Sequence, residues 1–312
     1  MESVVLGRTG LVVSVVGLGC GGHSRLGQSQ GSSVEDSIRL VREALDLGVT
    51  YIDTARGYGT EEIVGRALEG RREAAVVSTK ASVRSSEGLT DAVRLRHDIE
   101  QSLLQLRTDT IDVFHLHGVA PSDYAYCASE LIPELLAMRD RGTIRHLALS
   151  ERFPDDIGHE MLQQAANDDC WDVVMVGFNM LNPSARLRVF PQTMAAKVAV
   201  EVMFAVRSIF SQPAVLRETI ADAVAQGLVD ADALDQDDPL GFLVHEGGAD
   251  SVVEAAYRFA RHEPGCQVIL TGTGNIEHLR RNVRSINLPP LPEADLARLE
   301  SLFGHLEIFT GN

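Results

Sequence analysis

Short apolar runs and amphipathic stretches alternate along most of the chain. The runs are rich in Val, Ile and Leu, and the stretches between them repeat apolar residues at spacings of three and four. This alternation is typical of strands that are each followed by a helix. Eight strands are predicted, at 15–19, 50–53, 75–80, 111–117, 144–150, 173–178, 198–203 and 267–271. The clearest helical patterns cover 34–47, 61–68, 90–106, 129–141, 213–226 and 251–262.

Eight strand-helix repeats favour an α/β fold of the (β/α)8 TIM-barrel type over a doubly wound sheet. No Pro/Ser-rich linker or block of charge divides the sequence, so residues 1–312 are expected to form a single domain. Two additions to the barrel are predicted. Gly7 to Gly10 is typical of a hairpin turn at the barrel floor, and 292–303 indicates an extra C-terminal helix that ends near Gly304.

Composition narrows the class of protein and its compartment. A hydrophobic content of 45% and a charged fraction of 23% predict a soluble globular protein, and no apolar run approaches the ~20 residues of a membrane helix. The N-terminus lacks the features of a secretory signal, and the four cysteines lack CxxC spacing, so we expect reduced thiols and a cytoplasmic location. A net charge of -16 disfavours nucleic-acid binding. The oligomeric state is not predicted.

Four polar residues lie where consecutive predicted strands end. Asp53, Lys80 and His117 close three of the strands, and Tyr58 follows shortly after Asp53. The carboxyl ends of neighbouring strands in a parallel barrel meet at one face, where the active sites of such barrels lie. An acid, an amine, an imidazole and a phenol are therefore expected to converge on one catalytic pocket.

The segment Gly17 to Gly22 matches GxGxxG after a strand, a pattern typical of Rossmann dinucleotide sites. That motif requires its last glycine to open a helix. Here 23–33 is polar, and the helical pattern begins only near Val34. We therefore expect a glycine-rich first loop, in which Gly21 and Gly22 give a ligand close access to the backbone.

The segment from Tyr51 to Gly65, YIDTARGYGTEEIVG, resembles the aldo-keto reductase signature. In that family an aspartate ends the second strand and a tyrosine follows five residues later, as Asp53 and Tyr58 do here. Lys80 and His117 match the family's lysine and histidine on the next two strands. The resemblance runs from Leu6 to Asn282 and implies a nicotinamide-dependent barrel that acts on a small-molecule aldehyde, ketone, sugar or alcohol.

The chemistry of these residues is consistent with that expectation. The phenol of Tyr58 would serve as general acid or base, and a phenol has a reference pKa near ~10. The ammonium of Lys80 is expected to lower that pKa, and Asp53 to keep the amine charged and positioned. His117 would hydrogen-bond the substrate oxygen and orient the carbonyl.

The end of the last strand is the expected site for the phosphates of the cofactor, because barrels often bind phosphate at a helix N-terminus near strands seven and eight. The candidates are Gly272, Thr273, Gly274, Asn275, His278, Arg281 and Asn282. The family often has a basic residue four positions before the helix asparagine, and His278 stands there. The sequence leaves both NADP and NAD as candidate cofactors. NADP is slightly favoured, because the family generally uses it. Arg280, Arg281 and Arg284 are available for a 2′-phosphate.

Two positions at the expected nicotinamide end depart from the family pattern. Glu151 follows Ser150 where an asparagine is common, and a carboxylate cannot donate to the nicotinamide amide as an asparagine can. Met175 stands where a glutamine is common. Met203 or Phe204 is expected to stack on the nicotinamide, so Ser150, Glu151, Met175 and Met203 complete the predicted cofactor residues.

Substrate selectivity is expected from loops at the same face: 23–33, 118–127, 207–212 and the tail at Phe309. Tyr124 and Tyr126 either line a substrate pocket or pack their own loop.

Two alternatives to a reductase stay open from the sequence. The first is a nicotinamide-binding sensor barrel with weak turnover, suggested by Glu151 and Met175. The second is a metal-dependent hydrolase, because His115 and His117 lie on the same face of one strand. The other strands close with Ser150, Phe178, Met203 and Thr271 instead of further ligands, so no metal is expected.

Overall fold

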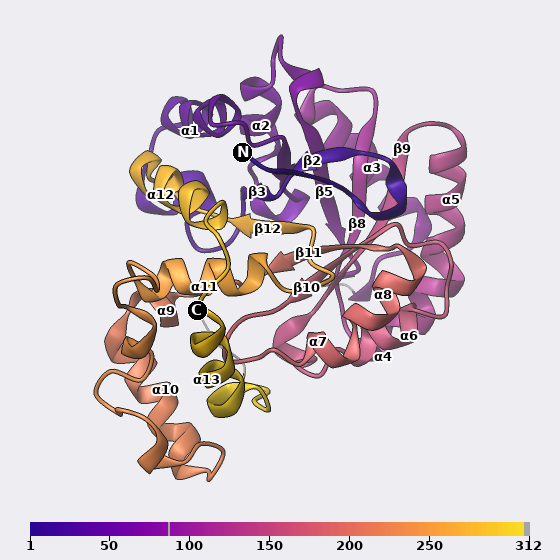
Figure 1. The fold of residues 1–312 in the computed structure, drawn as a ribbon. Helices are drawn as coiled ribbons and strands as arrows, with labels where there is room; N and C mark the ends of the chain where they lie inside the picture. The colour runs from indigo at the N-terminus through magenta and orange to yellow at the C-terminus, as the bar shows by residue number, and fades with distance from the viewer. Residues whose placement is uncertain (87, 309–312) are drawn as a thin grey trace.

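Eight parallel strands close into a barrel at the centre of the molecule (Figure 1). This computed structural model describes residues 1–86 and 88–308. The strands are β3 (Val16–Gly19), β4 (Tyr51–Asp53), β5 (Val76–Ser82), β8 (Ile111–Val119), β9 (Ile144–Glu151), β10 (Val173–Gly177), β11 (Ala199–Met203) and β12 (Val268–Thr271), and β12 pairs with β3 to close the ring. The predicted (β/α)8 barrel is confirmed, and each predicted strand coincides with one of these strands.

Helices surround the strands on the outside of the barrel (Figure 1). They are α1 (Val34–Asp46), α2 (Glu61–Ala67), α3 (Ala92–Leu106), α4 (Pro121–Tyr126), α5 (Ile132–Asp140), α6 (Glu160–Ala165), α7 (Ala185–Arg188), α8 (Phe190–Ala196), α9 (Ser208–Ser211), α10 (Pro213–Ala225), α11 (Val252–Arg261), α12 (Ile276–Ile286) and α13 (Glu293–Phe303). Short helices such as α6 and α7 were not predicted, because fewer than two turns show little periodicity.

Local side-chain chemistry sets the helix boundaries. Ser33 and Asp36 form a capping box that starts α1 at Val34, and the preceding loop contains only 3-10 turns between Arg25 and Gln30. A Rossmann helix does not follow the glycine motif, as the sequence indicated. The helix predicted over 90–106 begins at Ala92, because the Asp91 side chain caps it. The helix predicted over 129–141 begins at Ile132, after a π-helical turn.

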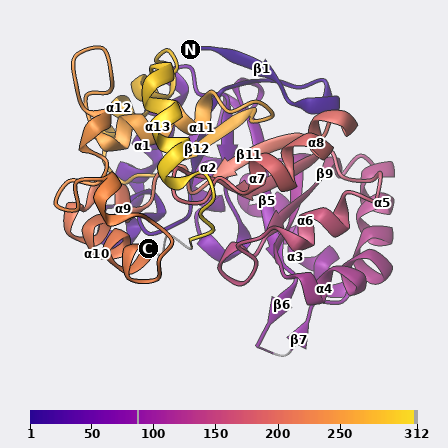
Figure 2. The same ribbon diagram turned by 60° about the horizontal axis from the view of Figure 1, so that its bottom comes forward.

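A hairpin of β1 (Ser3–Val5) and β2 (Val12–Ser14) accompanies the barrel, as the turn at Gly7 to Gly10 predicted. Leu6 and Val13 of this hairpin are buried against residues inside the barrel, including Tyr51 and Val113. Figure 2 shows a second hairpin, β6 (Arg84–Ser85) and β7 (Gly88–Leu89), that projects from the other side of the molecule. The first hairpin therefore supplies apolar residues to the lower barrel interior.

Strand alternation divides the buried residues into two sets. Outward-facing residues such as Ile52 and Phe114 pack with the helices in the large core. Inward-facing residues fill the barrel, and Gly17 makes room among them, since a Cβ there would lie 2.6 Å from the Leu270 side chain and 3.2 Å from the Tyr51 ring. None of the helices in the described part of the chain has the length and apolar character needed to cross a bilayer.

The contact between α2 and α3 gives a prediction about stability. A Cβ at Gly65 would lie 2.4 Å from the Gln105 carbonyl oxygen and 2.8 Å from the Leu106 carbonyl carbon. Backbone atoms cannot rotate away, so Gly65→Ala should reduce the free energy of unfolding by roughly 1–3 kcal/mol. The matched control is Gly57→Ala, where a Cβ meets nothing within 4 Å. Urea unfolding measures both variants, and a Gly65→Ala protein as stable as Gly57→Ala would contradict this packing.

Candidate active site

Four side chains meet where β4, β5 and β8 end. Asp53, Lys80 and His117 belong to these adjacent strands, and Tyr58 lies on a short 3-10 turn after β4, Arg56–Tyr58. The Lys80 Nζ atom lies 2.6 Å from both carboxylate oxygens of Asp53 and 5.1 Å from the centroid of the Tyr58 ring. The Tyr58 and His117 rings are perpendicular, with centroids 5.5 Å apart. The structure thus brings the four predicted catalytic residues together.

The ion pair between Lys80 and Asp53 is buried and has additional hydrogen bonds. Lys80 has no exposed surface and also donates to the Thr54 carbonyl oxygen at 2.8 Å, while Ser78 donates to Asp53 at 2.9 Å. Burial alone would lower the pKa of Lys80, but the charges of Asp53 and Tyr58 and the hydrogen bond to Asp53 raise it above its usual value. The ammonium is therefore a fixed positive charge beside the phenol.

Tyr58 and His117, which line the cavity, are both held in their neutral forms. Burial raises the pKa of Tyr58 above the usual phenol value, although the ammonium of Lys80 opposes this effect. The net direction differs from the expected lowering, because desolvation outweighs the neighbouring charge. Burial, together with the charges of Lys80 and His115, lowers the pKa of His117 to about 3. Near neutral pH the site therefore presents a protonated phenol and a neutral imidazole.

The loop after β3 holds Tyr58 from one side. The Arg25 Nε atom donates to the Tyr58 carbonyl oxygen at 2.7 Å. A Cβ at Gly21 would lie 2.3 Å from the Tyr58 ring, so only glycine allows the loop to lie against it. The sequence predicted Gly21 as a position that gives a ligand access to the backbone. In the structure its missing side chain makes room for the Tyr58 phenol.

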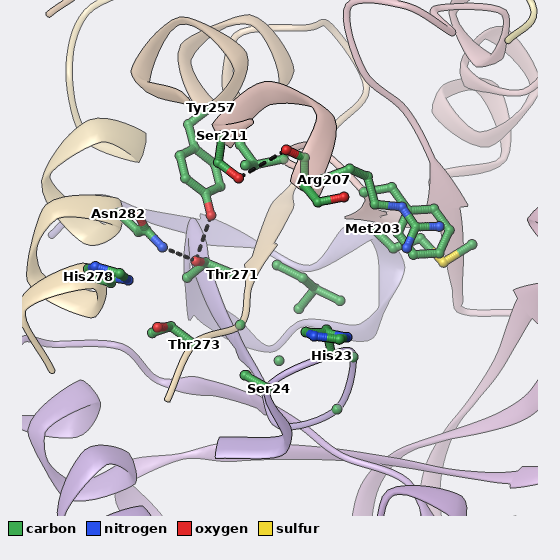
Figure 3. Close-up of a pocket in the computed structure, with 18 of the residues that line it drawn as sticks. His23, Ser24, Met203, Arg207, Ser211, Tyr257, Thr271, Thr273, His278 and Asn282 are labelled. Carbon is green, nitrogen blue, oxygen red and sulfur yellow. Dashed lines mark hydrogen bonds between the residues drawn. The ribbon is translucent and has the colours of Figure 1, made fainter. Parts of the chain in front are cut away.

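A cavity of about 1580 Å³ extends from the tetrad of Asp53, Tyr58, Lys80 and His117 to α12. Figure 3 shows part of its wall, from His23 and Met203 to His278 and Asn282 of α12. Typical small-molecule pockets have volumes of ~300–1,000 Å³, so this cavity has room for a dinucleotide and a substrate together. Asp53, Tyr58 and His117 line it, and Lys80 lies behind them. Every predicted cofactor residue also lines it: Gly21, Gly22, Ser150, Glu151, Met175, Met203, Gly272, Thr273, Gly274, Asn275, His278, Arg281 and Asn282.

At the predicted phosphate end, a glycine-rich turn leads from β12 into α12. The Asn275 side chain caps this helix by accepting from the backbone N–H groups of Glu277 and His278. Figure 3 shows Thr271 between Tyr257 and Asn282, whose amide donates to the Thr271 hydroxyl at 2.9 Å. Asn275 and Asn282 therefore form hydrogen bonds that hold this part of the pocket wall in place.

The three arginines of α12 differ in their surroundings. Arg280 bonds to Glu43 and Glu277, and it does not belong to the pocket wall as described. Arg281 and Arg284 line the pocket. Arg284 also lies 3.8 Å from Asp250, with both side chains largely exposed. Of the three arginines suggested by the sequence, two therefore line the pocket at the predicted phosphate end.

The Glu151 carboxylate is turned into the pocket wall. One oxygen accepts from the Gly177 N–H at 2.7 Å, the other lies 2.8 Å from His159 Nδ1, and the side chain has no exposed surface. Glu151 lines the pocket, but its carboxylate bonds within the protein, and its place among the cofactor residues stays a prediction. Glu151 joins the ends of β9 and β10 to the segment before α6. Sequence reasoning missed His159, whose left-handed backbone turns it toward Glu151.

Met175 of β10 is buried, and Met203 at the end of β11 is half-buried at the pocket surface. Phe204 packs against Phe153, and the Arg207 guanidinium lies 3.4 Å above the Phe204 ring centroid. Burial lowers the pKa of Arg207 to about 10. This arginine brings positive charge into the wall of the cavity (Figure 3).

The predicted selectivity loops contribute unequally to the cavity. His23 and Ser24 from the first loop, and Arg207 to Gln212 after β11, supply wall residues. Tyr124 and Tyr126 of α4 are not among the described wall residues. Their hydroxyls donate to the Asp168 carboxylate at 2.5 Å and to the Thr90 carbonyl oxygen at 3.3 Å. Phe309 lies outside the described residues.

Sequence reasoning also missed a polar layer inside the barrel, directly below the tetrad. His115 is fully buried, and its Nε2 atom lies 3.4 Å from a carboxylate oxygen of Glu201 on β11. The ring of His117 instead faces Tyr58. The structure therefore separates the two imidazoles that the metal-site hypothesis paired. Strand alternation carried a signal for Glu201, because it shares the inward face of β11 with Ala199 and Met203.

Known proteins match both the sequence and the fold. Oxidoreductase YqkF of Bacillus subtilis (strain 168), described as uncharacterized, is 26% identical over 330 aligned positions that cover 96% of each chain. L-galactose dehydrogenase of Arabidopsis thaliana is 35% identical over 158 residues, which cover 48% of each chain. The structure of aldo-keto reductase AKR11C1 from Bacillus halodurans in its holo form is similar with a TM-score of 0.74 and 22% identity, covering 97% of this chain and 96% of that one.

A second solved structure, an aldo/keto reductase from Klebsiella pneumoniae in complex with NADP and acetate, has a TM-score of 0.66 and 20% identity, and covers 97% of this chain and 96% of that one. At these identities the two structures support the shared fold. The sequence model of the Aldo/keto reductase family matches residues 17–303, a range that contains all four residues of the tetrad. The chain belongs to the aldo/keto reductase family.

Proposed function

We propose that the protein is an NADP-dependent oxidoreductase that interconverts a small carbonyl compound, such as an aldehyde, ketone or sugar, and the corresponding alcohol. The observation that carries this proposal is the buried Lys80–Asp53 ion pair beside Tyr58, at one end of a cavity large enough for a dinucleotide. The proposed unit is the single domain of residues 1–312. The free cysteines are consistent with the reducing environment of the cytoplasm.

The cavity wall suits a dinucleotide. The glycine-rich turn after β12 lies so close to the first loop that a Cβ at Gly274 would be 2.4 Å from Gly27. The buried Ser24 hydroxyl, in the pocket wall, has no hydrogen-bond partner among the described residues. Arg281, Arg284 and the start of α12 supply positive charge for phosphates at the far end.

In carbonyl reduction, the cofactor and the side chains at the end of the pocket would have separate roles. When bound, the nicotinamide cofactor supplies the hydride, which is the chemistry that side chains cannot provide. The neutral His117 ring and the Tyr58 hydroxyl hydrogen-bond the carbonyl oxygen and stabilise the charge that develops on it. Tyr58 then gives its proton to that oxygen, and the adjacent Lys80 ammonium stabilises the phenolate that forms. In alcohol oxidation the same groups act in the opposite sense.

We favour NADP because Arg281 of α12 brings positive charge to the pocket wall. Arg281 lines the pocket, and a 2′-phosphate would form charge-assisted hydrogen bonds to such a guanidinium. The aldo/keto reductase from Klebsiella pneumoniae with the same fold was solved with NADP and acetate.

Tyr58→Phe tests the proposed proton donor. General acid–base catalysis contributes on the order of 10²–10⁴-fold, so kcat for a good aldehyde should fall by that factor, while NADPH affinity, measured by fluorescence titration, should stay unchanged. The matched control is Tyr126→Phe, whose hydroxyl donates to the Thr90 carbonyl oxygen outside the pocket. Undiminished turnover in Tyr58→Phe would contradict the assignment. Tight NADPH binding with no turnover by the wild-type protein over a broad carbonyl panel would favour a sensor instead.

The low pKa of His117 gives a prediction about pH dependence. A histidine with an ordinary pKa near ~6.5 would add an acidic limb to the profile of kcat. The pKa of His117 is lowered to about 3, so its ring is neutral at every pH above that value. Reduction should therefore show no inflection near ~6.5 that depends on His117. An inflection there that His117→Gln removes would contradict this charge state.

Two neighbouring arginines of α12 give a matched pair of variants that tests the choice between NADP and NAD. Arg281→Ala should weaken NADPH binding by roughly 10- to 100-fold, because a hydrogen bond to a charged group contributes ~1.5–3 kcal/mol, and should leave NADH binding nearly unchanged. Arg280→Ala removes an arginine that bonds to Glu43 and Glu277, so it should alter neither affinity. Equal losses for NADPH and NADH in Arg281→Ala would show that Arg281 does not read the 2′-phosphate.

A further inference from the structure

Three ionisable side chains form a buried layer inside the barrel below the tetrad. Tyr51 comes from β4, His115 from β8 and Glu201 from β11, and all three have no exposed surface. β11 is adjacent to neither β4 nor β8 in the barrel order, so Glu201 reaches these residues across the interior. The proposed chemistry of Tyr58 uses none of the three directly.

Several buried polar atoms of this layer have no hydrogen-bond partner among the described residues. The Tyr51 hydroxyl donates to one oxygen of Glu201, and His115 Nε2 lies 3.4 Å from the same oxygen. The second Glu201 oxygen and both ring nitrogens of His115 have no hydrogen-bond partner among the described residues. A buried carboxylate is costly unless an opposite charge compensates it. His115 is the basic group in direct contact with this carboxylate.

Glu201 and His115 lie close to Asp53 of the tetrad, so a charge in this layer affects the electrostatics of the tetrad. One ligand atom from each of Asp53, His115 and Glu201 lies within 4.8 Å of the others. Burial lowers the pKa of Lys80, whereas Asp53, Tyr58 and also Glu201 raise it. The charged or titratable groups around Glu201 are thus Tyr51 and Asp53 from β4, Lys80 from β5 and His115 from β8. Its register partners on the adjacent strands, Met175 and Val268, are uncharged.

A metal ion is a less suitable occupant for this cluster. The Lys80 ammonium already lies 2.6 Å from both oxygens of Asp53, which are the oxygens that a metal would need. Two cations at that distance from one carboxylate would repel each other. The cluster is better explained as a buried polar layer in which the Glu201 carboxylate contacts Tyr51 and His115.

We propose that Glu201 is a positioning residue that sets the electrostatic field at the Tyr58 hydroxyl through the Lys80–Asp53 ion pair. Glu201 makes the surroundings of Lys80 more negative. The proposal rests on the proposed function of Tyr58 as proton donor. Its physical content, the effect of a buried charge on the ionisation of one phenol, can be measured without turnover.

The test is an ultraviolet difference titration of Tyr58, taken as the difference between each full-length protein and its Tyr58→Phe counterpart. Glu201→Gln keeps the shape of the side chain and an acceptor for Tyr51 while it removes the charge. The field at Tyr58 then becomes more positive, so Tyr58 should ionise at lower pH. The alkaline limb of kcat should move in the same direction.

The matched control is Glu61→Gln. Glu61 is also a buried carboxylate, but it bonds to the Thr79 hydroxyl on the outward face of β5 and lies 3.5 Å from Arg56. This variant should leave the ionisation of Tyr58 in place. An unchanged titration in folded Glu201→Gln overturns the proposal, as does an equal shift in Glu61→Gln.

A stoichiometric metal in the purified protein that Glu201→Gln removes would also overturn the proposal. Failure of the proposed catalytic function is distinguishable, because the titration gives its answer even if no substrate is turned over.

Discussion

The buried ion pair between Lys80 and Asp53 is the interaction on which the rest of the site depends. An ammonium with no exposed surface persists only if an anion and hydrogen-bond acceptors surround it, and Asp53 and the Thr54 carbonyl oxygen do so. Both partners stand at the carboxyl ends of adjacent parallel strands, so the barrel itself sets their distance. The ion pair fixes one positive charge beside the Tyr58 ring.

Close packing in and above the barrel holds the ion pair and the Tyr58 ring in place. Gly17 leaves space for Tyr51 in the interior, and Gly21 leaves space for the Tyr58 ring under the first loop. Glu151 ties β9 to β10 and to His159 on the opposite side of the cavity. The ligand cavity therefore lies between walls whose polar atoms are largely bonded within the protein, which limits reorganisation when a ligand binds.

Local sequence predicted those features that depend on neighbouring residues. Strand positions followed from runs such as Ile111 to His117, and the tetrad followed from the position of each residue at a strand end. The Glu201–Tyr51 contact was missed because it joins residues 150 positions apart. The net direction of the Tyr58 pKa was also missed, because burial is a property of the folded surroundings and outweighs the adjacent charge. The bond between Glu151 and His159 was also missed, because His159 adopts an αL backbone conformation that its local sequence does not indicate.

The most direct measurement of the central claim is the ionisation of Tyr58 in a protein that lacks the ion pair. A Lys80→Met/Asp53→Asn double variant removes both charges and leaves neither buried charge without its partner. Because the ammonium lowers the pKa of Tyr58 more than the carboxylate raises it, an ultraviolet difference titration should show ionisation at higher pH than in the wild-type protein. Ionisation at the same or a lower pH in the folded double variant would contradict the account.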